Sequence, residues 1–74
     1  MTIICGVDVS KAKLDACIEP GTAFASFDNT PAGIAELAAF CRKQGAELAM
    51  MEATGGYERL AFLLLWEAGM PCMP

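Results

Sequence analysis

The sequence predicts a single small α/β domain in which helices pack on a mixed β-sheet. Two observations predict it. Apolar residues in the first part of the chain fall into short runs separated by turn residues, which is typical of strands. Beyond Thr30 they recur every three to four residues, which is typical of a helix, and a further strand and helix follow. The expected order is βββαβα(β), with residues 1–74 in one domain.

The first three elements are expected to form an antiparallel meander of short strands. The residues from Ile3 to Val9 are mostly apolar and β-branched around a central glycine, as in a buried strand. Lys13 to Ile18 alternates in polarity and follows closely enough to be a hairpin partner. A turn at Pro20-Gly21 then leads to a third strand from Ala23 to Asp28.

A helix is expected after the meander. Thr30 suits the N-cap, Pro31 suits the first helical position, and Gly45 suits the end of the helix. One apolar face has the spacing i, i+3, i+4, i+7 and is formed by Ile34, Leu37, Ala38 and Cys41.

A second strand–helix unit follows. Ala46 to Met51 predicts a strand that is apolar on both faces near its end, as a central parallel strand is. A right-handed crossover returns such a strand parallel to one of the first three. Gly55-Gly56 interrupts the chain, a second helix is expected from about Tyr57 to Ala68, and Met70 to Met73 begins another strand.

This second helix is apolar on two sides. Its faces are formed by Leu60, Leu63 and Leu64 and by Phe62, Leu65 and Trp66. A helix of this kind packs against two surfaces, of which the sheet supplies one. Hydrophobic residues make up 55% of the chain, above the usual value of about 45–50%. We therefore predict a homo-oligomer that associates through the second helix.

Two acidic residues mark the candidate site. Asp8 closes the first apolar strand, and Glu52 closes the fourth. If these strands are parallel neighbours, both carboxylates lie at the strand ends where α/β sheets bind ligands. Two poorly solvated carboxylates at one place favour a shared divalent metal ion, and Gly6, on the face of Asp8, leaves room for a substrate backbone. The alternatives are an Asp8 that accepts hydrogen bonds from turn N–H groups and a Glu52 that is solvated in a loop.

Charge limits how this chain could contact a nucleic acid. The net charge of −4 argues against a polyanion-binding surface over the whole chain, and the absence of histidine removes imidazole as a base or metal ligand. Lys11 follows the first acid, and Thr54, Gly55, Gly56 and Arg59 surround the start of the second helix, whose N–H groups suit a phosphate. The same residues equally fit a solvated edge and a plain loop-to-helix turn.

The four cysteines form no CxxC motif and have no histidine to complete a mixed zinc site. We expect reduced, mostly buried thiols. No secretory signal precedes the first strand, so the protein is expected to be cytoplasmic. The longest wholly apolar run, Leu60 to Trp66, is too short for a membrane span, and no membrane partner is expected.

Three stretches resemble the N-terminal part of the transposases of insertion-sequence family 110, the Piv/MooV-like DEDD recombinases. They are Gly6-Val7-Asp8-Val9-Ser10-Lys11, Asn29-Thr30-Pro31-Ala32-Gly33 and Met51-Glu52-Ala53-Thr54-Gly55-Gly56-Tyr57-Glu58. The third stretch is the most specific, whereas the first is shared more loosely within the same fold superfamily. The resemblance covers nearly the whole chain.

This resemblance implies an RNase H-like (RuvC-like) fold, in agreement with the order βββαβα(β). It implies that Asp8 and Glu52 are the first D and the E of the DEDD tetrad, which binds Mg²⁺ and acts on DNA in transposition, guided in some members by a structured RNA. The last two aspartates and a serine nucleophile of this family lie downstream, and the sequence, which ends at Pro74, contains none of them. The chain is therefore expected to be the truncated first half of a catalytic domain, inactive in isolation, with weak or no metal binding.

Two other functions stay open at this point. The order βββαβα also fits half of an actin-like or sugar-kinase-like ATPase domain, although the turn Ser10-Lys11-Ala12 lacks the glycine usual in the phosphate loop of that superfamily. Nucleotide binding would favour it. The other is a non-enzymatic oligomerisation module that uses the second helix, and a stable monomer at high concentration would count against it.

Overall fold

The structure is a computed structural model that describes residues 1–53 and 55–74. Over these residues it contains five strands and two helices in the predicted order. They are β1 (Ile4–Val9), β2 (Lys13–Glu19), β3 (Phe24–Asp28), α1 (Pro31–Lys43), β4 (Leu48–Ala53), α2 (Arg59–Glu67) and β5 (Cys72–Met73).

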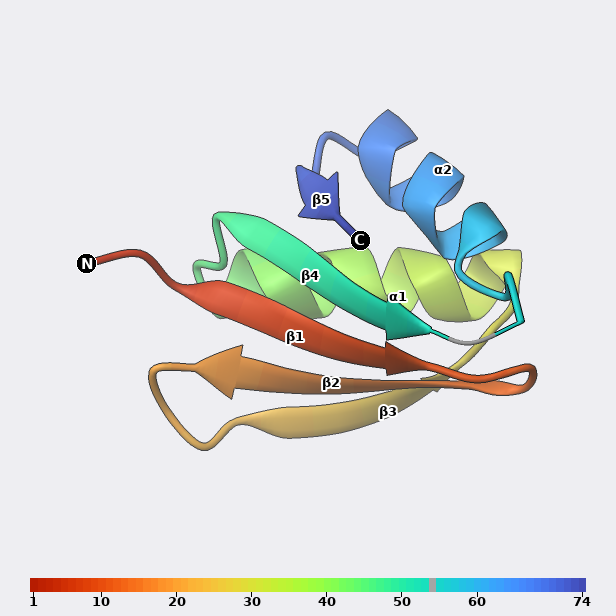
Figure 1. The fold of residues 1–74 in the computed structure, drawn as a ribbon. Coiled ribbons are helices and arrows are strands. Elements are labelled where there is room, and N and C mark those ends of the chain that lie inside the picture. Colours follow the sequence, from red (N-terminus) through yellow and green to blue (C-terminus); the bar gives the residue numbers. More distant parts are fainter. Residues whose placement is uncertain (54) are drawn as a thin grey trace.

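The strands form one mixed sheet in the order β3-β2-β1-β4-β5 (Figure 1). β1, β2 and β3 pair antiparallel as a meander, β4 is parallel to β1, and β5 is parallel to β4. α1 supplies the crossover between β3 and β4. The predicted mixed sheet is thus confirmed. Of the three meander strands, β1 is the parallel neighbour of β4, the arrangement on which a site shared by the two strands depends.

Both helices contribute to a core on one side of this sheet. Alternate strand residues such as Cys5, Val7 and Val9 are buried, because successive side chains of a strand point to opposite faces. Figure 1 shows α1 running behind the strands, and the buried side chains of α1 and α2 belong to the same core cluster as this face. We call this the covered face. The alternate residues form the open face: Ile4, Gly6, Asp8, Lys13, Asp15, Cys17, Glu19, Phe24, Ser26, Asp28, Leu48, Met50 and Glu52.

α1 forms as expected from its N-cap and its apolar stripe. The Thr30 hydroxyl accepts a hydrogen bond of 3.1 Å from the Gly33 N–H, and Pro31 occupies the first turn. A Cβ on Gly33 would overlap the backbone of Asp28, so glycine is the residue that lets the start of α1 lie against the end of β3. The predicted stripe is buried, and it consists of Ile34, Leu37, Ala38 and Cys41.

α2 is shorter than expected, because it begins at Arg59 and ends at Glu67 rather than running from Tyr57 to Ala68. Gly55 and Gly56 have φ values of +76° and +79°, so the chain first turns through residues 55–58. Within α2, Ala61 and Leu65 are buried, whereas the Leu63 and Trp66 side chains are 54% and 63% exposed. The helix therefore has an uncovered apolar side, as its sequence predicted. Neither described helix has the length and hydropathy needed to cross a membrane.

Candidate functional site

Asp8 and Glu52 lie side by side on the open face. They are direct partners in the parallel β1–β4 ladder, and neighbouring strands lie about 4.8 Å apart. Both side chains are exposed and point away from the helices. The expected juxtaposition is confirmed, with two differences. Both carboxylates are exposed instead of poorly solvated, and Glu52 lies within β4, whereas the predicted strand ended at Met51. β4 continues to Ala53 because the alternation of buried and exposed residues persists through Met51 and Glu52.

A third carboxylate lies on the other side of Asp8. Asp15 is the antiparallel partner of Asp8 in the β1–β2 ladder, and its Oδ1 accepts a 2.7 Å hydrogen bond from the Ser26 hydroxyl. Asp15 was not among the site residues predicted from the sequence. The information was present, because a tight turn at residues 10–12 fixes the hairpin register and thus places Asp15 opposite Asp8.

The open face is hollowed beneath these acids, and the hollow has a volume of about 640 Å³. Asp8, Asp15 and Glu52 line one part of it, together with apolar side chains that include Phe24 and Met50. None of its described lining residues is a lysine or an arginine. Like charges on directly opposed strand residues repel, so a cation in this hollow would stabilise the fold.

The basic residue of the open face that is nearest to Asp8 in sequence is Lys13, and it already forms an ion pair. Lys13 lies opposite Asp28 across the β2–β3 ladder, and its Nζ donates a 2.7 Å hydrogen bond to Asp28 Oδ1. This hydrogen bond, with the Coulomb attraction of the same carboxylate, raises the pKa of Lys13 above 10.5. Lys13 is therefore part of a solvated ion pair at the sheet surface and is not a free counter-charge for Asp8.

The donor set fits part of a magnesium shell. Magnesium is held in proteins by one or two carboxylates, with water and phosphate oxygens completing the octahedron, and Asp8 with Glu52 supplies such a pair. Over residues 1–53 and 55–74, no three His, Cys, Asp or Glu side chains are grouped closely enough to hold a metal ion. What these residues offer is an incomplete set of ligands, which is suited to weak binding.

The remaining predicted site residues follow the two strands. The turn at residues 10–12 comes directly after β1, and Lys11 is exposed there. The chain after β4 carries Gly55 and Gly56 and leads into α2, so both segments lie at the carboxyl edge of the β1–β4 pair (Figure 1). Thr54, also a predicted nucleic-acid contact, lies outside the described residues.

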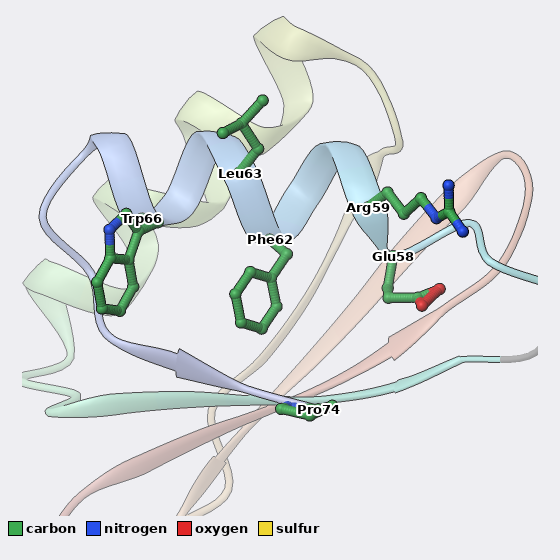
Figure 2. Close-up of a pocket in the computed structure, with 6 residues that line it drawn as sticks. All are labelled: Glu58, Arg59, Phe62, Leu63, Trp66 and Pro74. Atoms are coloured by element: carbon green, nitrogen blue, oxygen red, sulfur yellow. The ribbon is translucent and has the colours of Figure 1, made fainter.

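The start of α2 is open. Its N-cap residue is Glu58, which makes no side-chain capping hydrogen bond, so the first N–H groups of the helix have no side-chain partner of this kind. Arg59 is exposed, and Figure 2 shows its guanidinium extending away from the underside of α2. The geometry permits contact with an anion at this edge of the sheet.

The cysteines are free thiols, as expected. Cys5, Cys41 and Cys72 are buried and Cys17 is exposed on the open face beside the hollow. The adjacent Cys41 thiol, together with burial, raises the pKa of Cys5 above its ordinary value, so this thiol stays protonated at neutral pH. The buried cysteines thus act as small core side chains.

The chain matches a known protein family over nearly its whole length. The family model for the DEDD transposases of insertion-sequence family 110, described as a transposase, matches residues 5–74. The chain belongs to this transposase family. A search among curated proteins gave no match.

Family membership changes what the site means. The match spans both strands that carry the acids, so the resemblance found in the motifs of this transposase chain is confirmed. Transposases act on DNA, and DNA is thus implied as a partner.

Proposed function

We propose that this chain is the first part of the catalytic domain of a DEDD transposase, in which Asp8 and Glu52 supply the first two carboxylates of a site for metal-dependent DNA cleavage and strand transfer. The single observation that carries the proposal is their placement. The two residues occupy one rung of the parallel β1–β4 ladder, on the open face, in a hollow with no described basic lining residue. The family match supports the assignment of the pair to DNA chemistry.

The residues have distinct tasks under this proposal. Asp8 and Glu52 would hold Mg²⁺ on the open face, and Asp15 adds negative potential from the neighbouring strand. When bound, Mg²⁺ supplies the charge that stabilises the attacking and leaving oxygens of a phosphodiester. Gly6 leaves space for a substrate beside Asp8. An added Cβ would have its nearest atom 3.8 Å away, so it would fit the fold but would occupy part of that space.

The DNA backbone would be held at the carboxyl edge of the sheet. The proposed contacts are Lys11, Thr54, Gly55, Gly56 and Arg59, which combine two positive charges with backbone N–H groups near the start of α2. A net charge of −4 means that DNA is not attracted to the chain as a whole. We further propose that a structured guide RNA is a second nucleic-acid partner. We also propose that the protein is located in the cytoplasm.

Two carboxylates are not a complete site, and the isolated chain is expected to be inactive with a Kd for Mg²⁺ on the order of millimolar. Mg²⁺ titration of the ¹⁵N-labelled chain tests this, with chemical-shift changes expected around Asp8 and Glu52 and absent in Asp8→Asn. Glu36→Gln is a matched control, because Glu36 is an exposed carboxylate of α1 that does not line the hollow. Micromolar binding, or binding that Asp8→Asn leaves unchanged, would reject the proposal.

We also propose that α2 mediates association with a second copy of the chain. Phe62 and Trp66 extend from one side of α2 toward Pro74 and line an apolar groove of about 640 Å³ (Figure 2). Arg59 and Leu63 also line this groove, and together with Glu67 they form one row at i, i+4 and i+8. Two antiparallel copies of α2 that cross at Leu63 would place each Arg59 against the Glu67 of the other copy.

Sedimentation equilibrium tests this association. Glu67→Arg is expected to weaken dimerisation through like-charge repulsion, and the double variant Arg59→Glu/Glu67→Arg is expected to restore it. Leu63→Glu should yield a monomer. A wild-type chain that sediments only as a monomer at high concentration would contradict the proposal.

A further inference from the structure

Asn29 joins three segments at the carboxyl edge of the sheet. It lies between the end of β3 and the N-cap of α1. Its backbone N–H donates a 2.9 Å hydrogen bond to Ala12 O. Its side-chain Nδ2 donates to Ser10 O at 3.0 Å and to Tyr57 O at 3.1 Å. One side chain therefore spans sequence separations of 19 and 28 residues.

Asn29 joins the segments that directly follow the strands carrying Asp8 and Glu52. Ser10 opens the turn two residues after Asp8, and Tyr57 lies in the loop between Glu52 and α2. Asp8 and Glu52 are each the next-to-last residue of a strand, where the hydrogen-bond ladder is most easily frayed. A tie between the two following segments holds both strand ends against such opening.

The chemistry of the tie requires an amide. Both acceptors are main-chain carbonyl oxygens, and only the NH₂ group of Asn29 can face them favourably. The Oδ1 atom is buried and has no hydrogen-bond partner among the described residues. Aspartate would have the same shape, but it would turn a carboxylate oxygen toward the two carbonyls, so it would repel both.

We infer that Asn29 is a positioning residue, which fixes the spacing of the Asp8 and Glu52 carboxylates by tying together the segments that follow them. This inference rests on the proposed metal site. Asn29 then has a different role from its neighbours in the Asn29-Thr30-Pro31-Ala32-Gly33 stretch. The Thr30 side chain caps α1, and Gly33 lets the start of α1 lie against β3. Within that stretch, it is Asn29 whose side chain reaches the edge where the acids lie.

The first part of the test is made without metal. Amide hydrogen exchange is measured by NMR in wild type, Asn29→Ala and Thr30→Ala, with Thr30→Ala as the control that removes one neighbouring hydrogen bond. In Asn29→Ala, the amides of Ser10 and Phe62, which bond to Lys13 O and Glu58 O, are expected to exchange at least about fivefold faster than in wild type. In Thr30→Ala, the increase should be confined to the first turn of α1. If Asn29→Ala does not fold, Asn29→Ser replaces it in both parts, because its single hydroxyl donor can bond at most one of the two carbonyls.

The second part uses Mn²⁺ as a paramagnetic probe of the acids. Mn²⁺ should broaden the Asp8 and Glu52 amide signals in wild type and in Thr30→Ala, and about fivefold more Mn²⁺ should be needed in Asn29→Ala. Equal titrations in all three proteins, or equal weakening in both variants, would overturn the positioning role. Absence of broadening in wild type would instead refute the proposed metal site, so the two failures are distinguishable.

Discussion

The two faces of the sheet differ in the burial of their side chains and in the charges that they carry. The covered face consists of side chains such as Val7, Leu14 and Met51 that are at most 3% exposed and pack under the helices. The open face places three carboxylates on adjacent strands and leaves Phe24 64% exposed. One side of each strand therefore supplies stability, while the other side carries exposed charges and leaves room for a ligand.

The largest expected difference between the faces is in the cost of removing a side chain. Leu37→Ala, in the core under the covered face, should lower the free energy of unfolding by about 2–5 kcal/mol. Met50→Ala, on the open face, should lower it by less than about 1 kcal/mol. Urea denaturation followed by circular dichroism measures both. Equal losses would show that the open face is also part of a core.

Glycine substitutions sharpen the same contrast. Gly33→Ala is expected to lower the free energy of unfolding by about 1–3 kcal/mol, because its Cβ would overlap the Asp28 backbone. Gly6→Ala should change it by less than about 1 kcal/mol, because the nearest atom lies 3.8 Å away. Thermal melting of the two variants compares them, and a Gly6→Ala variant as unstable as Gly33→Ala would mean that Gly6 is needed for folding and not only for access.

Neutralising Asp8 should stabilise the chain in the absence of metal. Asp8 is the direct partner of both Asp15 and Glu52, so Asp8→Asn removes two like-charge contacts and is expected to gain about 0.2–1 kcal/mol. The gain should shrink as salt is added. Glu36→Gln, on the exposed side of α1, is the control and should have little effect. An Asp8→Asn variant that unfolds at lower urea than wild type would contradict the repulsion.

The smallest effect is expected from the one described ion pair of the open face. The pKa of Lys13 is raised in the folded chain by the hydrogen bond and charge of Asp28. The pair therefore contributes fully below the unfolded pKa of about 10.4, and its contribution is lost as pH rises through the higher folded value. The melting temperature of wild type relative to Lys13→Met should fall by no more than about 2 °C above pH 10.5. A wild-type advantage that grows with pH would contradict this sign.

The strands, the first helix and the Asp8–Glu52 pair were predictable because they depend on local patterns and one topological rule. Hydrophobic period and capping defined α1, and the preference for right-handed crossovers limited where β4 could pair. Asp15 was not predicted, because its position opposite Asp8 depends on the register of the β1–β2 hairpin and not on a local pattern. The late start of α2 reflects two successive glycines with positive φ, which the apolar pattern alone does not reveal.

Asn29 illustrates what sequence reasoning cannot supply. The Asn29-Thr30-Pro31-Ala32-Gly33 motif is visible in the sequence, but a residue before an N-cap can have many local roles. The contacts to Ser10 and Tyr57 arise only when the sheet brings three turns to one edge. Such long-range hydrogen bonds have no periodic signature, so they are found by structure.

The shared rung of Asp8 and Glu52 also bears on how the protein folds. The two residues are 44 positions apart in sequence (52 minus 8), and β2, β3 and α1 lie between them. Closing so long a loop has a large entropic cost, whereas the β1–β2 and β2–β3 hairpins close over short ones. The β1–β4 pairing is therefore expected to form after the meander. During synthesis, the two acids remain apart until β4 has left the ribosome, so the nascent chain acquires its paired carboxylates only once most of this fold is in place.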